Sequence, residues 1–344
     1  MSSEVTVGVV ANPASGRDIR RLVAGASVFD NSEKGNMVYR LMVGLSAVGV
    51  GRVIMMPAAS GLYDSLERTL RSHAAAEKPP LPHLELLEMT VRHTARDTVY
   101  AVEEMVGRGV AAIVVLGGDG TNRLVARHCQ NLPLCTLSTG TNNTFPAMRE
   151  ATVAGLATGL VATGQAGGEA LRREKILRVG VNGEADRDCA LVDVAVSADR
   201  FVGARALWRP DEISEIFVAS ASPDAVGLSS VAGLLDPTPR SAPYGLHLRL
   251  TAPEEAETVL TVPLAPGLVV PVGVAEKRRL QPGESTEIEP VSGSIALDGE
   301  REIEVGPGDR VEVSLDVGGP LTIDVGAVMQ EAARSGLLNG DLRA

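Results

Sequence analysis

A short segment in the first half of the chain combines glycines with one acidic side chain. Residues 112–121 have the sequence Ala-Ile-Val-Val-Leu-Gly-Gly-Asp-Gly-Thr. The apolar, β-branched first half is typical of a parallel strand that is buried on both faces. Gly117, Gly118 and Gly120 lack a Cβ, so the backbone can turn sharply there with positive φ and approach a ligand closely. A helix expected over residues 122–130 would point its free N–H groups and positive dipole end at an anion, so the segment predicts phosphate chemistry.

Asp119 is the acidic side chain of this turn and our first candidate for a general base. The surrounding glycines leave its carboxylate unshielded beside the expected phosphate site. A free hydroxyl is a poor nucleophile, and a positioned carboxylate that takes its proton typically contributes about 10² to 10⁴ in rate. Asp is also a common helix N-cap and Asx-turn residue, so a structural role for Asp119 is the alternative interpretation.

Strand-like and helix-like segments alternate over the first 165 residues, which favours a parallel sheet with helices on its faces. Ligands of open α/β sheets bind at the carboxyl edge of the strands, so we expect the site in loops 12–16, 117–121 and 138–144. Thr94 is the predicted N-cap of a helix over residues 95–106, and another helix is predicted to end at Arg71. The expected strands span residues 5–11, 52–56, 84–89, 112–116 and 134–137.

Beyond about residue 175 the sequence changes to short strand-like segments that are broken by Gly, Pro and Asp, which predicts a mostly β second half. Residues 164–168 are rich in glycine and lack apolar periodicity, so the domain boundary is expected there. We expect an α/β nucleotide-binding domain over residues 1–165, a β-rich substrate domain over 166–326, and a tail over 327–344 that returns to the first domain. The expected strands include residues 176–181, 191–196, 246–251 and 268–274.

Composition favours a soluble enzyme of two domains, because 344 residues exceed the usual size of one core and 44% of them are hydrophobic. A net charge of −11 disfavours a general nucleic-acid binder, whose binding face is basic. The cysteines lack CxxC spacing, so neither a disulfide framework nor a zinc site is indicated. No apolar stretch approaches the roughly 18 residues of a membrane span. We expect a cytoplasmic homo-oligomer that binds no nucleic acid and has no transmembrane segment.

The common nucleotide-binding fingerprints are missing, since the chain has no Gly-Lys dipeptide and no GxGxxG after a strand. Three other motifs resemble those of the NAD kinase and diacylglycerol kinase superfamily. They are Asn-Pro-Ala-Ser-Gly at 12–16, Gly-Gly-Asp-Gly-Thr-Asn at 117–122, and Ser-Thr-Gly-Thr-Asn-Asn-Thr-Phe at 138–145. Asp-Gly-Glu at 298–300 is similar to the fourth element, found in the lipid-kinase branch. The extended first and third motifs most resemble the acetoin catabolism protein X-like subgroup of the ATP-NAD kinase-like family.

This resemblance implies a Rossmann-like parallel α/β domain, a C-terminal β-sandwich-like domain, and an active site in the cleft between them. It also implies that the first two loops hold the phosphates of ATP, that Mg²⁺ bridges these phosphates, and that an acidic residue deprotonates the acceptor hydroxyl. The catalytic set is then Asp119, Asp298 and Glu300, although Asp298-Gly299 is also a strong type I′ hairpin signal. The residues expected at the nucleotide are Asn12, Ser15, Gly16, Gly117, Gly118, Gly120, Thr121, Asn122, Thr139, Gly140, Thr141, Asn142 and Asn143.

These features favour an ATP- and Mg²⁺-dependent kinase that phosphorylates a hydroxyl of a nucleotide-like small molecule, with NAD as the nearest candidate. NAD kinases carry an Asn-Glu pair in the second domain, whereas the corresponding stretch here is Ala190-Leu-Val-Asp-Val-Ala195. The identity of the acceptor therefore stays open. A diacylglycerol or sphingoid lipid kinase is the alternative enzyme. A nucleotide-binding regulatory protein without turnover is the alternative from another class.

Overall fold

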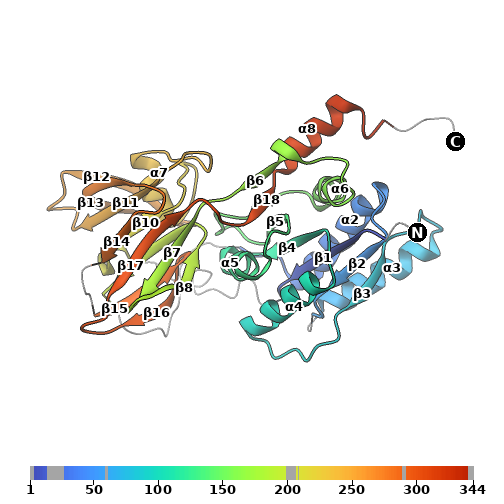
Figure 1. The fold of residues 1–344 in the computed structure, drawn as a ribbon, viewed down its shortest axis with the longest axis horizontal. Coiled ribbons are helices and arrows are strands. Elements are labelled where there is room, and N and C mark those ends of the chain that lie inside the picture. Colours follow the sequence, from blue (N-terminus) through green and yellow to red (C-terminus); the bar gives the residue numbers. More distant parts are fainter. Residues whose placement is uncertain are drawn as a thin grey trace.

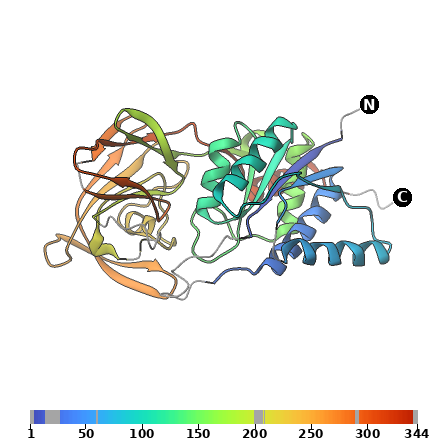
Figure 2. The same cartoon turned by 90° about the horizontal axis from the view of Figure 1, so that it is seen from below.

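The computed structural model describes residues 4–13, 27–58, 61–198, 207, 209–288 and 292–339 of the chain. Two lobes lie side by side, an α/β lobe at the right of Figure 1 and a β-rich lobe at its left. The view from below shows the same division (Figure 2). The predicted order, a parallel α/β fold followed by a β-rich fold, is confirmed.

The α/β lobe is built on a seven-stranded sheet. Its strands are β1 (Thr6–Ala11), β2 (Arg52–Met55), β3 (His83–Leu86), β4 (Ala112–Gly117), β5 (Leu134–Ser138), β6 (Leu171–Arg173) and β18 (Leu321–Ile323). They lie in the order β3-β2-β1-β4-β5-β18-β6, and all pairs are parallel except β18 with β6. The strand order reverses between β1 and β4, and ligands of open α/β sheets bind at such a switch point.

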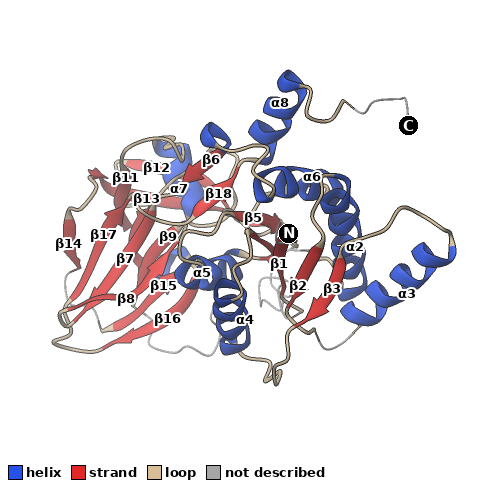
Figure 3. Ribbon diagram, turned by 45° about the vertical axis from the view of Figure 1, so that its right-hand side comes forward, coloured by secondary structure: helices blue, strands red, loops and turns tan. Residues whose placement is uncertain are grey.

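Helices cover both faces of this sheet (Figure 3). One face packs against α2 (Asn31–Ala47), α3 (Leu62–Ala75), α6 (Ala151–Ala162) and α8 (Val325–Ser335). The other packs against α4 (Ala95–Gly107) and α5 (Asp119–His128). Thr94 is the N-cap of α4, as predicted, and forms a capping box with Asp97. Among the described residues, no helix has the length and apolar character needed to cross a membrane.

The β-rich lobe is a sandwich of two antiparallel sheets. The larger has the order β12-β13-β11-β10-β9-β15-β16 and the smaller β14-β17-β7-β8. A shared core lies between them, and α7 with its neighbours covers the outer face of the larger sheet. The elements are β7 (Ile176–Val181), β8 (Glu184–Ala190), β9 (Asp193–Ser197), β10 (Ile213–Val218), α7 (Ser229–Leu235), β11 (Gly245–Thr251), β12 (Thr258–Ala265), β13 (Leu268–Leu280), β14 (Ser285–Ile288), β15 (Gly293–Leu297), β16 (Glu300–Val305) and β17 (Val311–Asp316), with a short 3₁₀ turn at Pro210–Glu212. Another 3₁₀ turn, at Gly168–Ala170, precedes β6 in the α/β lobe.

The chain crosses between the lobes twice, on two strands that are hydrogen-bonded to each other. Strand β6 leads out to β7, and β17 leads back to β18. Between these pairs the backbone N–H of Glu174 donates to Pro320, and that of Gly319 donates to Glu174. Strands β6 and β18 fall by sequence within the predicted second domain, yet both pair in the first sheet. The two lobes therefore do not follow a single cut in the sequence, and the predicted domain limits stay a prediction.

Candidate active site

Loops from three neighbouring strands meet at the carboxyl edge of the first sheet. Asn12, which follows β1, donates from its side-chain amide to Oγ1 of Thr121 at 3.0 Å, and its backbone N–H donates to Leu116. This contact joins the Asn-Pro loop to the first turn of α5. Ser15 and Gly16, also predicted to bind phosphate, lie outside the described residues.

The glycines after β4 allow close contacts. A Cβ on Gly117 would lie 2.7 Å from Cβ of Thr121, and a Cβ on Gly118 would lie 2.7 Å from Oδ1 of Asn143. The side chains of Thr121 and Asn143 therefore lie so close to the backbone that only glycine fits at positions 117 and 118 without a shift. The expectation of positive φ was wrong, because none of the three glycines in this loop adopts a left-handed conformation.

Asp119 begins α5 but does not cap it. The N-cap is Gly118, so helix α5 starts three residues earlier than predicted. The Asp119 carboxylate instead accepts hydrogen bonds from the backbone of the loop after β5, with Thr144 N at 3.0 Å from Oδ2 and Phe145 N at 2.8 Å from Oδ1. The carboxylate is thereby held in a fixed orientation at the junction of two loops, while the residue keeps part of its surface exposed.

Several residues that were predicted to bind the nucleotide support the loops themselves. Asn143 donates to Oγ of Ser138 at 2.7 Å and to the carbonyl of Gly140 at 3.3 Å. Oγ1 of Thr141 accepts from the backbone N–H of Ser27 at 3.0 Å. Thr139 is buried, whereas Asn142 is partly exposed.

Asn122 is placed in the interior, away from the loop surface. Its residue is 0% exposed, and its side-chain amide donates to the carbonyl of Gly118 at 2.9 Å. The side-chain amide of Asn122 therefore braces the preceding turn, and a contact of Asn122 with the nucleotide stays a prediction.

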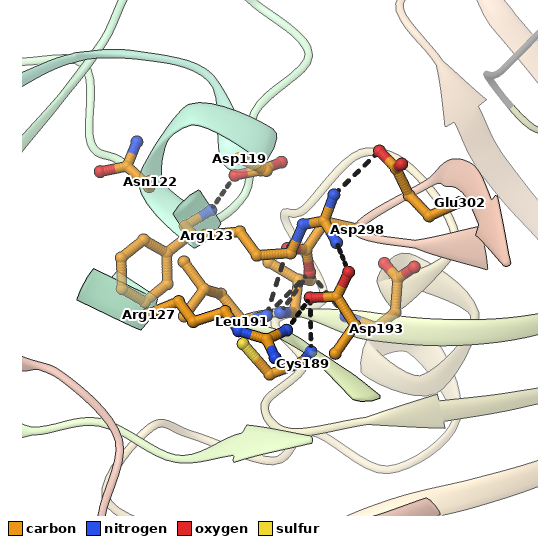
Figure 4. A network of polar contacts seen from close by, with 12 residues as sticks. Asp119, Asn122, Arg123, Arg127, Cys189, Leu191, Asp193, Asp298 and Glu302 are labelled. Carbon is orange, nitrogen blue, oxygen red and sulfur yellow. Dashed lines mark hydrogen bonds and ion pairs between the residues drawn. The ribbon is translucent and has the colours of Figure 1, made fainter. Parts of the chain in front are cut away.

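The Asp-Gly-Glu element forms the predicted hairpin turn between β15 and β16. Asp298 and Gly299 have φ of 52° and 77°, as a type I′ turn requires. The fully buried carboxylate of Asp298 accepts from the backbone N–H groups of Leu191 at 3.0 Å and Val192 at 2.7 Å (Figure 4). Burial raises the pKa of Asp298 to about 6, partly offset by the positive charge of Arg123. These contacts hold the Asp298 carboxylate within the turn, two residues before Glu300, and its catalytic role stays a prediction.

Glu300 comes from the second lobe and reaches the first turn of α5. A Cβ on Gly120 would lie 3.8 Å from Oε2 of Glu300, so the missing Cβ leaves this carboxylate beside the helix N-terminus. Asp119 is the first residue of α5, and Glu300 reaches the same helix end from the other lobe. In the part of the chain that the structure describes, no group of three or more His, Cys, Asp or Glu side chains is arranged to hold a metal ion.

Two domain models match the chain in succession. The ATP-NAD kinase N-terminal domain matches residues 7–166, and the acetoin catabolism protein X C-terminal domain matches residues 175–317. Acetoin catabolism protein X from Cupriavidus necator is 46% identical over 340 residues, which cover 96% of this chain and 93% of that protein. The chain belongs to the acetoin catabolism protein X family. The resemblance found in the motifs is confirmed.

Solved structures similar to this family member include a putative diacylglycerol kinase from Bacillus anthracis strain Sterne. It is 13% identical, with a TM-score of 0.41, and the match covers 94% of this chain and 97% of that one. A second diacylglycerol kinase structure from the same strain is also 13% identical, with a TM-score of 0.38 and the same coverage.

In this family member, two buried cations near the loops were missed by the sequence predictions. Lys34 in α2 is 1% exposed, and its ammonium donates to the carbonyl of Asn12 at 3.1 Å and to Oδ1 of Asn31 at 3.4 Å. Arg123 in α5 contacts carboxylates that are distant in sequence, at Asp188 and Glu302. No local motif surrounds Lys34 or Arg123 in the sequence. Asn12, Asp188 and Glu302 are distant from them in sequence and meet them only in the folded chain.

The second lobe also holds the loop that orients Asp119. The guanidinium of Arg240 donates to the carbonyl of Phe145 at 2.5 Å and lies 4.8 Å from the centroid of its ring. Thr144 Oγ1 donates to the carbonyl of Val226 at 3.3 Å. The two residues that donate to Asp119 are therefore themselves anchored to the opposite lobe.

Proposed function

We propose that this protein is a phosphotransferase that moves the terminal phosphoryl group of a nucleoside triphosphate, ATP in the first instance, to a hydroxyl of a nucleotide-like small molecule. One observation carries the proposal: Asp119 begins α5 beside the switch point of the sheet, and Glu300 reaches the same helix end from the second lobe. Phosphoryl transfer needs mainly positioning and charge stabilisation, and a carboxylate is a suitable base for the acceptor hydroxyl.

The donor phosphates fit the first turn of α5. The N–H groups of this turn have no partner inside the helix, and the positive end of the helix dipole favours an anion. Asn12 and Thr121 tie the neighbouring loop to the same turn, so both loops offer polar groups at one place. A triphosphate bound there lies beside Asp119, whose orientation is fixed by Thr144 and Phe145.

We assign the base to Asp119, and to Glu300 the task of orienting the acceptor hydroxyl from the other lobe. A base must hold a defined orientation within hydrogen-bond reach of the proton it takes, and the two N–H donors give Asp119 that orientation. Glu300 faces the same helix turn across Gly120. The acceptor is then bound between the lobes, with its hydroxyl between the two carboxylates.

The donor set suits Mg²⁺, which is usually held by one or two carboxylates together with substrate phosphates and waters. Asp119 and Glu300 supply two carboxylates at the expected phosphate position. When bound, Mg²⁺ neutralises charge on the phosphates during transfer.

The test is ADP release by the purified protein with Mg²⁺ and ATP, using NAD, NADH, diacylglycerol and a sphingoid base as separate acceptors. Asp119→Asn is expected to lower the rate by about 10² to 10⁴, the usual contribution of a general base. Asp64→Asn is the matched control, since Asp64 is an exposed acid in the first turn of α3 in the same lobe. Its rate should equal that of the wild type.

The outcomes separate the candidate functions. NAD-dependent release that Asp119→Asn abolishes supports a nucleotide acceptor, and lipid-dependent release supports a lipid kinase. Saturable ATP binding by calorimetry without turnover on any acceptor identifies a nucleotide-binding regulatory protein. If the protein neither binds ATP nor turns over any acceptor, the proposal is overturned.

A further inference from the structure

One side of helix α5 faces the second lobe. Gly120, Arg123 and Arg127 follow one another at spacings of three and four residues, so they lie on the same side of the helix. Gly120 faces Glu300, and both arginines contact acidic side chains of the second lobe. The helix that begins with the candidate base Asp119 therefore contacts the second lobe, which carries Glu300, through this side.

The guanidinium of Arg123 lies among three carboxylates of the second lobe, of which Figure 4 labels Asp298 and Glu302. Nη1 is 3.1 Å from Oδ2 of Asp188, Nη2 is 2.9 Å from Oε1 of Glu302, and Nε is 4.0 Å from Oδ2 of Asp298. Burial by itself lowers the pKa of Arg123, but Asp298, Asp188 and Glu302 raise it above its ordinary value. With 6% of its side chain exposed, Arg123 is a permanent buried cation, and these three carboxylates compensate its charge.

Two of the partners flank Glu300 at equal distance in the sequence. Asp298 lies two residues before it and Glu302 two residues after it. Glu302 is displaced by a β-bulge, because Ala296 pairs with Arg301 and Ile295 with Ile303, which leaves Glu302 as the extra residue. Bulges re-aim side chains and are frequent next to active sites. Here the extra residue of the bulge, Glu302, supplies one of the carboxylates that contact Arg123.

We propose that Arg123 is a positioning residue that binds the hairpin on both sides of Glu300 and thereby fixes the Glu300 carboxylate against the first turn of α5. Its effect on rate rests on the proposed phosphotransfer. Its effect on the hairpin rests on the observed contacts alone, so the two parts are tested separately.

Arg127 provides a matched comparison. It lies one turn further along α5 and contacts Oδ1 of Asp188 at 2.8 Å and the carbonyls of Asp186 and Arg187 at 3.0 and 3.1 Å. None of these groups adjoins Glu300 in sequence. If the arginines serve only to hold the lobes together, substitutions of Arg123 and Arg127 have the same effect.

The kinetic test compares Arg123→Gln, Arg123→Lys and Arg127→Gln in the ADP-release assay, after circular dichroism has shown that each variant is folded. Arg123→Gln is expected to lower kcat about 100-fold, the usual consequence of a displacement of about 1 Å at a reacting group, with little change in KM for ATP. Arg123→Lys should recover part of the loss, and Arg127→Gln should retain wild-type kcat. Added methylguanidinium should restore turnover to Arg123→Ala, because it replaces the missing cation.

The hairpin test needs no turnover. The backbone N–H groups of Leu191 and Val192 donate to Asp298, so their hydrogen exchange reports whether the turn is held in place. Exchange at residues 191–193 and 298–302 should be faster in Arg123→Gln and unchanged in Arg127→Gln. Equal exchange in the two variants, or no change in either, overturns the inference. If the wild type turns over no acceptor, the proposed function fails, and exchange alone decides whether Arg123 holds the hairpin.

Discussion

Replacing Asp298 with asparagine separates the charge of this side chain from its position in the turn. Asn tolerates the positive φ of 52° found here, and Asn-Gly is a preferred type I′ pair. The variant should therefore keep the hairpin between β15 and β16. It removes one ionisable group whose side chain is fully buried.

The magnitude follows from the pKa of Asp298, which burial raises from 3.8 to about 6. One pKa unit corresponds to about 1.4 kcal/mol, so the difference corresponds to about 3 kcal/mol of unfolding free energy. Because the pKa of the folded state is the higher one, the favourable contribution is fully present below pH 3.8. It is lost as the pH rises through about 6, where the buried carboxylate ionises.

Chemical denaturation of the wild type and Asp298→Asn between pH 4 and pH 8 measures this effect. The free energy of unfolding of the wild type, relative to the variant, should fall by about 2.5 kcal/mol across the interval, slightly less than the full difference because part of it lies below pH 4. Any loss from exchanging a hydrogen-bond acceptor for an amide is independent of pH and shifts the whole curve. Parallel curves for the two proteins would refute the assignment of a raised pKa to Asp298.

Three further predictions concern other parts of the chain. Gly118→Ala brings a methyl group against Oδ1 of Asn143 and should destabilise the protein by about 1–3 kcal/mol in urea denaturation, whereas Gly120→Ala should not. A combined Gly118→Ala and Asn143→Ala variant should regain part of the loss. Arg240→Ala removes a hydrogen bond and a cation–π contact to the loop that holds the candidate base, which should cost about 1–3 kcal/mol in the same assay. The cysteines are buried, and burial raises the pKa of Cys189 to about 12, so iodoacetamide at pH 8 should label them only after unfolding, as read by mass spectrometry.

Local patterns predicted the elements that carry the loops. The β-branched run before Gly117 does form a strand, and Asp298-Gly299 does form the hairpin, because both signals depend on a few adjacent residues. Helices α2 and α6 were not predicted. Helix α6 contains Gly155 and Gly159, which disfavour a helix locally, yet the glycines allow its backbone to pack closely against α2.

The arrangement of the site depended on contacts between distant residues. The sequence left a helix cap as the alternative role of Asp119, whereas its carboxylate accepts from Thr144 and Phe145, 25 and 26 residues away. Arg123 and Glu302 are separated by 179 residues. A single sequence contains no local sign of such pairs, so the predictions located the loops but not the side chains that hold them together.

The paired crossing strands limit how the lobes can move. Strands β6 and β18 continue into β7 and β17 with hydrogen bonds at Glu174, Gly319 and Pro320 between the two pairs (Figure 1). A ribbon of two bonded strands bends and twists as a unit, unlike a single flexible linker. Any separation of the lobes would therefore turn about this ribbon, and it would break the ion pairs of Arg123 and Arg127 with the second lobe.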